Sequence, residues 1–111
     1  MNNVFKNAVA KAEDSFNDAK LLLSHERYSA AINRCYYAVY YLSNAMLLEK
    51  EIHVKMHSGV IRKFSEIFEK RQVADYDMEY HIHFDEAEQT LKDAREFIDT
   101  IKEIVLNRNK I

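Results

Sequence analysis

Apolar residues recur at spacings of three and four positions along four stretches of the chain, which is the period of one face of an α-helix. The pattern predicts helices over residues 3–24, 27–49, 58–70 and 85–106. On the third of these helices, the spacing predicts that Ile61, Phe64 and Phe68 face the core. The chain therefore has the pattern of several amphipathic helices packed around a shared interior.

The connections between these segments predict how the helices are arranged. Only a few residues around His25 join the first two helices, which forces an antiparallel hairpin. Residues 50–57 form the next connection, and residues 71–84 form either a loop or an irregular helical extension. Asp85 with Glu88 predicts a capping box at the start of the last helix. We expect an all-α fold, an up-and-down four-helix bundle.

Composition supports a helical chain and narrows its setting. The chain has 111 residues, one glycine and no proline, so the usual turn chemistry of β-hairpins is nearly absent. This length fits a single domain over residues 1–111. No apolar run approaches the roughly 18 residues of a membrane span, and the first residues do not resemble a signal peptide. The single cysteine, Cys35, cannot form an internal disulfide, and we expect a cytoplasmic location.

Charge is distributed unevenly along the chain, although the formal net charge is only −2. Residues 50–71 hold six Lys or Arg against three Asp or Glu, whereas residues 75–103 hold three against ten. This balance disfavours a globally basic nucleic-acid binder and leaves room for a local basic patch. The simplest explanation of both charge runs is a solvated helix face.

Some apolar and aromatic residues fall outside the main stripes of the second and fourth predicted helices. These are Tyr36, Tyr40, Phe97 and Ile104. A second apolar face on a helix is typical of an interface between subunits. The pattern therefore predicts a homodimer.

The segment 27–41 places many polar groups in a predicted helix that we expect to be buried. Burying a polar group costs roughly 1–3 kcal/mol unless it is paired. Asn33 and Arg34 are adjacent, so they point about 100° apart and at most one faces the core squarely. Arg34 near Asp75 would make a buried pair, which would be evidence for a specified geometry more than for stability. The tyrosines of the segment, Tyr37 among them, belong to the core, to a dimer interface or to a base-stacking surface.

Two blocks of sequence carry a resemblance to a known family. NRCYYA at residues 33–38 and RQVADY at residues 71–76, with His57 between them, resemble the HEPN domain of bacteria and archaea. The resemblance implies a small α-bundle, usually homodimeric, often encoded beside a minimal nucleotidyltransferase in a toxin–antitoxin pair. It implies for many members a metal-independent ribonuclease whose motif is an Arg, four to six residues and a His. Members without that motif are regarded as nucleotide-binding or scaffold-like.

This chain departs from the ribonuclease motif. Arg71 matches the arginine, but Tyr76, Asp77 and Met78 occupy the three positions where the histidine would fall. The nearest downstream histidines, His81 and His83, lie too far along the chain. In addition, only two residues separate Phe68 from Arg71, where the resemblance implies a longer segment.

Arg71, Asp75 and Tyr76 are the candidate catalytic residues. A guanidinium suits a phosphate, and Asp75 or Tyr76 would have to replace the histidine in moving a proton. Carboxylic acids and phenols as classes titrate far from neutral pH, so neither is an easy substitute. The structural interpretation is an Arg71–Asp75 pair four residues apart that also bonds Asn33 or a tyrosine.

Histidines at positions 53 and 57 share a spacing used by zinc sites, but no cysteine lies near and no metal or other cofactor is expected. His57 more simply fixes the start of the third helix, and the resemblance leaves a role at the polar site open. The expected nucleotide- or RNA-binding residues are Asn33, Arg34, Tyr37 and His57.

The resulting functional prediction is a HEPN-family partner of a minimal nucleotidyltransferase, or a nucleotide-binding module, with weak or no nuclease activity. The alternative is a metal-independent ribonuclease toxin that acts as a homodimer. The predicted partners are a second copy of the chain, a nucleotidyltransferase and RNA or a nucleotide, with no membrane.

Overall fold

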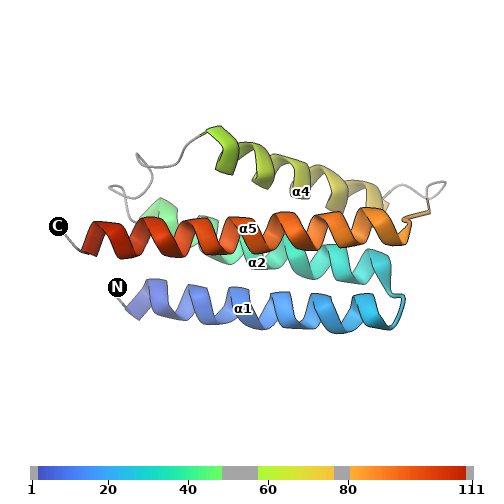
Figure 1. The fold of residues 1–111 in the computed structure, drawn as a ribbon, viewed down its shortest axis with the longest axis horizontal. Helices are drawn as coiled ribbons and strands as arrows, with labels where there is room; N and C mark the ends of the chain where they lie inside the picture. Colours follow the sequence, from blue (N-terminus) through green and yellow to red (C-terminus); the bar gives the residue numbers. More distant parts are fainter. Residues whose placement is uncertain (1–2, 49–57, 77–80, 110–111) are drawn as a thin grey trace.

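The structure is a computed structural model that describes the backbone of residues 3–48, 58–76 and 81–109. Its helices are α1 (Asn3–Ser24), α2 (Tyr28–Leu48), α4 (Ser58–Tyr76) and α5 (Phe84–Asn109). Successive helices run in alternating directions, and both chain termini lie at the same end of the molecule (Figure 1). The described residues contain no strand. The predicted all-α, up-and-down bundle is confirmed.

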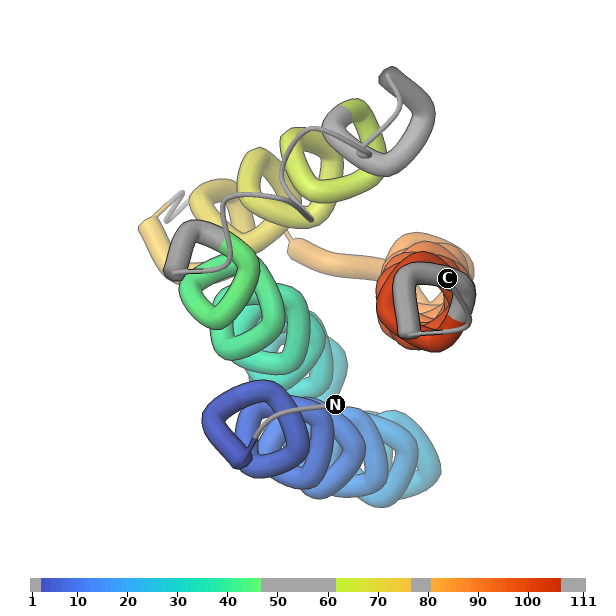
Figure 2. The backbone as a smooth tube through the Cα atoms, turned by 90° about the vertical axis from the view of Figure 1, so that its left-hand side faces the viewer, coloured from blue at the N-terminus to red at the C-terminus, as the bar shows by residue number. Residues whose placement is uncertain are grey.

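The four helices are not packed as a square. Helices α2 and α5 contact each other across the centre, while α1 and α4 lie on opposite sides and do not touch within the described residues (Figure 2). Within the described part of the chain, α4 is therefore held by α2 and α5 alone. Among the described helices, none is both long and apolar enough to cross a membrane.

The core consists of large side chains set among alanines. The bulky residues with essentially no exposed surface include Phe5, Ile32, Leu42, Met46, Ile67, Phe97, Ile98 and Ile101. Ala12, Ala19 and Ala31 are fully buried and allow α1 and α2 to approach closely along their length. Burial also raises the pKa of the Cys35 thiol to about 12, with a smaller contribution from Asp93. Cys35 is therefore part of the core rather than a nucleophile.

Helix α4 corrects two sequence predictions. It continues six residues past the predicted end at Lys70, so Arg71–Tyr76 are helical. The inward position predicted for Phe68 is wrong, because Phe68 is 37% exposed and Ile67 is fully buried instead. The inward line of the longer helix passes through Phe64, Ile67 and Arg71 at spacings of three and four. Ile61 lies outside the described side chains.

The predicted second apolar face is wrong for its two α5 residues. Phe97 has no exposed surface, and Ile104 packs against the core. Helix α5 contacts α1, α2 and α4, so it buries a wider face than a helix with two neighbours. Tyr36 is also partly buried against the core, whereas Tyr40 is 39% exposed.

The helix ends are formed by local backbone contacts. At the α1–α2 turn, Glu26 adopts a φ of 60°, a left-handed conformation that usually belongs to glycine. The Arg27 N–H then donates to the Leu22 carbonyl at 2.9 Å. At the start of α5, the backbone N–H of His83 donates to Glu86 Oε1 at 3.4 Å. The capping contact thus forms two residues earlier than the predicted Asp85–Glu88 pair.

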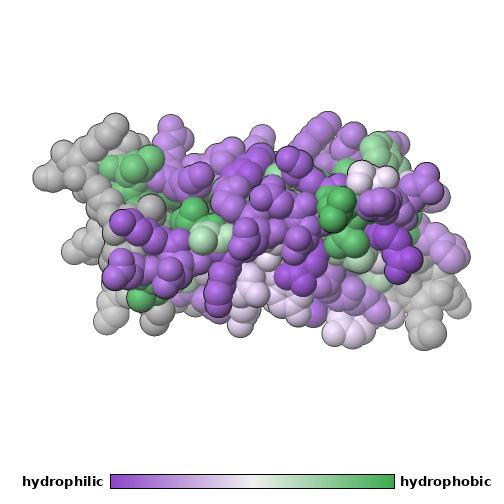
Figure 3. All heavy atoms as spheres, turned by 90° about the horizontal axis from the view of Figure 1, so that it is seen from below, coloured by the Kyte–Doolittle hydropathy of each residue, from purple (hydrophilic) through white to green (hydrophobic). Residues whose placement is uncertain are grey.

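Ion pairs join α5 to both outer helices. Arg95 of α5 donates two hydrogen bonds of 2.6 and 3.0 Å to Glu13 of α1, and its guanidinium lies over the Phe16 ring. On the other side, Lys63 of α4 pairs with Glu96 and Asp93 of α5. The face seen from the α1 side is mostly hydrophilic, with apolar side chains gathered toward its two ends (Figure 3).

The Glu13–Arg95 contact predicts acid-dependent stability. The hydrogen bond from Arg95 holds the pKa of Glu13 below its usual value of 4.5. This stabilisation is fully present above pH 4.5 and disappears as the pH falls through the lowered pKa of the folded state. Both side chains are about 30% exposed, so solvent screening limits the contribution to about 1 kcal/mol or less.

We expect Glu13→Gln to lower the free energy of unfolding at neutral pH and to match the wild type in strong acid. Urea unfolding of both proteins at neutral pH and near pH 3 measures this difference. A difference that stays the same at both pH values would contradict the assigned role of Glu13.

Candidate functional site

Three polar side chains meet where the beginning of α2 contacts the end of α4. Asn33 Nδ2 donates to Asp75 Oδ2 at 2.9 Å, and Arg71 Nε lies 3.1 Å from the same oxygen. The helical extension of α4 makes this possible, because Arg71 and Asp75 then share one helix face. The contacts of the structural interpretation, an Arg71–Asp75 pair that also bonds Asn33, are therefore confirmed.

The guanidinium of Arg71 is held on several sides. Its central carbon lies 4.6 Å from the centre of the Tyr36 ring and 5.8 Å from the centre of the Tyr76 ring. Its Nε is buried, and the contact of this atom with Asp75 lacks the angles of a hydrogen bond. Among the described residues, no hydrogen bond or ion pair engages the two terminal nitrogens of Arg71. The side chain is thus fixed in position, and within the described residues its terminal donors have no partner.

Arg34 belongs to a different neighbourhood. The Arg34–Asp75 pair considered from the sequence does not form, because Arg34 Nη2 donates to Ser15 Oγ of α1 at 3.3 Å. The guanidinium of Arg34 also lies over the Tyr37 ring, with its central carbon 5.0 Å from the ring centre. Adjacent residues on a helix point about 100° apart, so Asn33 faces α4 while Arg34 faces α1. The predicted binding residues therefore divide into two groups on either side of α2.

The remaining predicted residues have simple placements. Tyr76 ends α4 and is 67% exposed, with one side of its ring near Arg71. His57, like His53, lies outside the described residues. Within the part of the chain that the structure describes, no group of three His, Cys, Asp or Glu side chains is placed to hold a metal ion.

Tyr36 is the residue of this site that the sequence reasoning missed. It was assigned to an outer apolar face, but its ring lies against both Arg71 and Phe68. The signal was present in the spacing, since Tyr36 follows Asn33 by three positions and so lies on the same side of α2.

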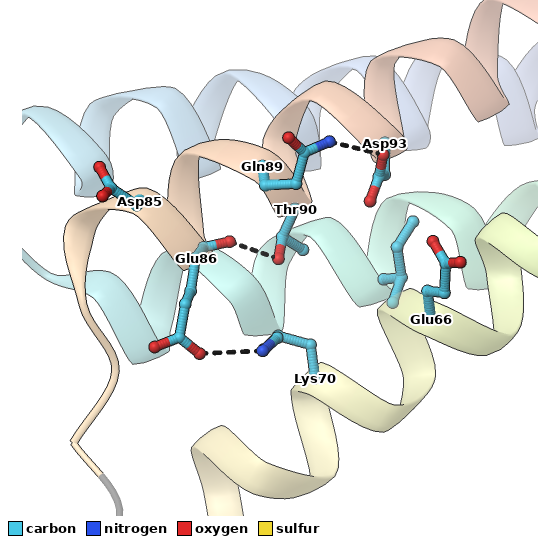
Figure 4. A pocket seen from close by; sticks show the side chains of 8 residues that line it. Glu66, Lys70, Asp85, Glu86, Gln89, Thr90 and Asp93 are labelled. Atoms are coloured by element: carbon cyan, nitrogen blue, oxygen red, sulfur yellow. Dashed lines mark hydrogen bonds and ion pairs between the residues drawn. The ribbon is translucent and has the colours of Figure 1, made fainter.

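A groove of about 370 Å³ lies on the other side of α4, against α5 (Figure 4). Lys70 Nζ reaches across it to Glu86 Oε2 at 2.9 Å. The other acidic groups of the groove include Glu66 and Asp93, which pair with Arg62 and Lys63. The Lys70–Glu86 and Lys63–Asp93 pairs join α4 to α5, whereas the Arg62–Glu66 pair lies within α4. The negative charge of these carboxylates opposes the binding of a phosphate.

Comparison with known proteins gives a consistent match over most of the chain. Residues 5–79 match the HEPN domain family. The chain is 34% identical to "Putative toxin MJ0142" of Methanocaldococcus jannaschii over 91% of this chain and 81% of that protein. It is 30% identical to a "UPF0332 protein" of Thermotoga maritima, with 86% of each chain covered. It is also 30% identical to "Putative toxin MJ0605" of M. jannaschii, over 82% of this chain and 81% of that protein.

The alignment with the first of these relatives also bears on the short segment before Arg71. It runs over 119 positions but covers 91% of the 111 residues here, which is about 101 residues. About 18 aligned positions of that relative therefore have no counterpart in this chain. An internal shortening of this size agrees in direction with the longer segment that the resemblance implies.

The shared oxygen of Asp75 predicts energetic coupling between α2 and α4. We expect the Asn33→Ala and Asp75→Ala changes to be non-additive, with a coupling free energy of about 0.5–1.5 kcal/mol. Urea unfolding of the two single variants and the double variant measures this quantity. Asn44→Ala, an exposed change further along α2, combined with Asp75→Ala serves as the uncoupled control. Equal coupling in both cycles would show that the Asn33 hydrogen bond contributes nothing specific.

Proposed function

Because the chain belongs to the HEPN domain family, we propose that it is a toxin-like binding module that takes a phosphate group at Arg71. The phosphate belongs to a nucleotide or to RNA. The module has weak or no nuclease activity of its own. It works with a minimal nucleotidyltransferase as partner.

The main support for this proposal is the way in which the neighbouring residues hold the Arg71 side chain. A planar guanidinium can bind a phosphate through two parallel hydrogen bonds, and stacking on aromatic rings restricts its movement. The contacts with Tyr36 and Tyr76 provide that stacking, and Asp75 occupies only the Nε side. The nearby carboxylate competes with an incoming anion, so the expected affinity is moderate rather than tight.

The weak nuclease activity follows from what surrounds Arg71. RNA cleavage needs a cation for the transition state and a second group that moves the proton of the 2′-hydroxyl. The motif position for that second group holds Tyr76, Asp77 and Met78 instead of histidine. Asp75 is already engaged by Arg71 and Asn33 through one oxygen, so it serves as a structural partner rather than as a free base.

The proposed partners rest on sequence relationships. Two of the relatives are named as putative toxins. The resemblance implies that such HEPN proteins pair with a nucleotidyltransferase and form homodimers. Phe97 is buried and Ile104 is partly buried against the core, so the homodimer no longer draws support from them. A nucleotidyltransferase that is encoded beside this chain and co-purifies with it would support the first partner.

The second candidate function is a metal-independent ribonuclease toxin acting as a homodimer. One observation favours it: the Tyr76 ring lies beside the Arg71 guanidinium, so a phenol and a cation share one exposed site. In that mechanism Arg71 would stabilise the transition state, and Tyr76 or Asp75 would move the proton.

Binding of adenosine monophosphate, measured by isothermal titration calorimetry, tests the binding module. We expect Arg71→Ala to weaken it at least about tenfold, because a hydrogen bond to a charged group contributes roughly 1.5–3 kcal/mol. Asn33→Leu should also weaken binding, since it removes the donor that fixes Asp75. The matched control is Arg62→Ala, because Arg62 lies on the same helix, is 73% exposed and pairs with Glu66. Equal losses in Arg71→Ala and Arg62→Ala would contradict a specific site.

Incubation with labelled single-stranded RNA separates the two candidate functions. We expect the wild-type protein to leave the RNA intact at high protein concentration, with and without EDTA. Cleavage that survives EDTA and disappears in Arg71→Ala would overturn the binding module and support the ribonuclease.

A further inference from the structure

The groove of about 370 Å³ between α4 and α5 has no part in the proposed function (Figure 4). Its bottom is formed by Ile67 of α4 and Thr90 of α5, which line the groove and are 0% and 4% exposed. The Thr90 hydroxyl donates to the backbone carbonyl of Glu86 at 2.8 Å, so it is engaged within its own helix. The floor of the groove is therefore mainly apolar.

Carboxylates from both helices line the groove above this floor. Glu66 belongs to α4, and Asp85, Glu86 and Asp93 belong to α5. Within the described part of the chain, Lys70 is the one cation among the residues that line the groove. Its pair with Glu86 lies between Asp85 at one end and Asp93 at the other (Figure 4). The lining therefore carries more negative than positive charge.

The carboxylates at the two ends are incompletely paired within the chain. Both side-chain contacts of Asp93 use Oδ1, so its Oδ2 has no partner within the described residues. The contact of Glu66 with an arginine of its own helix is 3.8 Å long, and both side chains are more than half exposed. Asp85 is exposed and pairs with no cation of the described residues. Each end of the groove can therefore accept a further cation.

The spacing of these carboxylates defines the shape of a complementary ligand. Asp85 and Asp93 are eight residues apart on α5, which corresponds to about 12 Å along the helix axis. Glu66 points into the same space as Asp93 (Figure 4). A matching ligand carries two cations about this far apart, each on an apolar stem that can lie against the floor. Lysine and arginine side chains combine a charged end with such a stem.

We propose that this groove is a docking site for a protein partner, which lays an extended basic segment along it. One lysine or arginine of the segment lies between Glu66 and Asp93, and a second lies beside Asp85. Main-chain atoms of the segment stay outside the groove, and the two aliphatic stems cover its floor. The inference goes beyond the proposed function, because it does not depend on a phosphate at Arg71.

Charge complementarity favours this ligand over the alternatives. A phosphate backbone would meet four carboxylates and be repelled. A two-fold interface through the groove would bring the same carboxylates of both copies together. Every lysine and arginine of α4 and α5 whose side chain is described already lies in an ion pair, so the second copy would offer no spare cation there.

Nuclear magnetic resonance titration of the isotope-labelled protein with short peptides tests the docking site. The lysine peptide has about eight residues, alanine except for two lysines four positions apart, which spans roughly 13 Å in an extended chain with both on one side. We expect the amide signals of Ile67 and Thr90 to shift until they saturate. Glutamine in place of lysine should abolish the shifts. Diaminopropionic acid, with the same charge on a single methylene, should bind more weakly because it cannot cover the floor.

Variants that remove a charge but keep the side-chain size locate the bound peptide. Glu66→Gln and Asp93→Asn should each weaken binding of the lysine peptide about two- to fivefold, the range of a partly exposed ion pair. Glu66→Gln changes an exposed side chain, so its result does not depend on a change in folding. The matched control is Glu88→Gln, because Glu88 lies on α5 outside the groove and pairs with Lys92. It should bind the peptide as the wild type does.

Several results would overturn the proposal. The absence of saturable shifts with the lysine peptide is one, and equal losses in Glu66→Gln and Glu88→Gln are another. Equal binding of the lysine and diaminopropionic acid peptides would indicate diffuse attraction rather than docking. Tighter binding of free spermidine would make the ligand a small polycation, and a change of oligomeric state of Glu66→Gln in size-exclusion chromatography would make it a second copy.

The same proteins separate this proposal from the proposed function. If the groove fails these tests while adenosine monophosphate binding still depends on Arg71, the proposed function stands and the docking site falls. If the lysine peptide binds as expected and adenosine monophosphate binding does not depend on Arg71, the docking site stands and the phosphate site falls.

Discussion

One carboxylate oxygen fixes the relation between the second helix and the helix that carries the candidate site. Asp75 Oδ2 accepts the Asn33 amide from α2 and faces the Arg71 guanidinium from its own helix. Burial alone would fix α4 poorly, because Ile67 is the only side chain of its described part that is fully buried. The polar contact therefore sets the rotation of α4, and that rotation determines which of its residues face α2.

In the rest of the bundle, some helices are held together mainly by apolar contacts and others by apolar contacts combined with ion pairs. Helices α1 and α2 meet through alanines and large buried residues, which gives a long, close contact. Helix α5 has three neighbours and combines a buried stripe with ion pairs on both flanks, to Glu13 of α1 and to Lys63 and Lys70 of α4. Acidic residues of α5 thus pair with two lysines of α4, whereas toward α1 the charges are reversed and Arg95 of α5 pairs with Glu13.

The periodic pattern predicted α1 with its observed bounds and α2 to within one residue at its start, because their apolar stripes are long and regular. It failed at the end of α4. Residues 71–76 contain no proline or glycine that would end a helix, and their inward position is an arginine, which apolar periodicity does not detect. The position of Phe97 was missed for a different reason, since a helix with three neighbours buries residues outside a single stripe.

The candidate site was predicted in part for similar reasons. The Arg71–Asp75 pair is a local contact within one helix, so its spacing was sufficient. The partner of Arg34 depends on which neighbour lies beside it, and the sequence alone did not show that Ser15 of α1 would be there. The role of Tyr36 also required knowing that α4 packs beside α2 and not only beside α5.

The sparse burial of α4 has a consequence for the dynamics of the molecule. A helix whose described part has one fully buried side chain, Ile67, and one partly buried against the core, Phe64, opens locally at a lower free energy than the helices that form the core. Amide hydrogen exchange in α4 should accordingly be faster than in α1 and α2, although all are regular helices. A ligand that bridges α4 and α2 would slow amide exchange in α4 selectively. Ligand binding could then be detected from the exchange rates of this one helix.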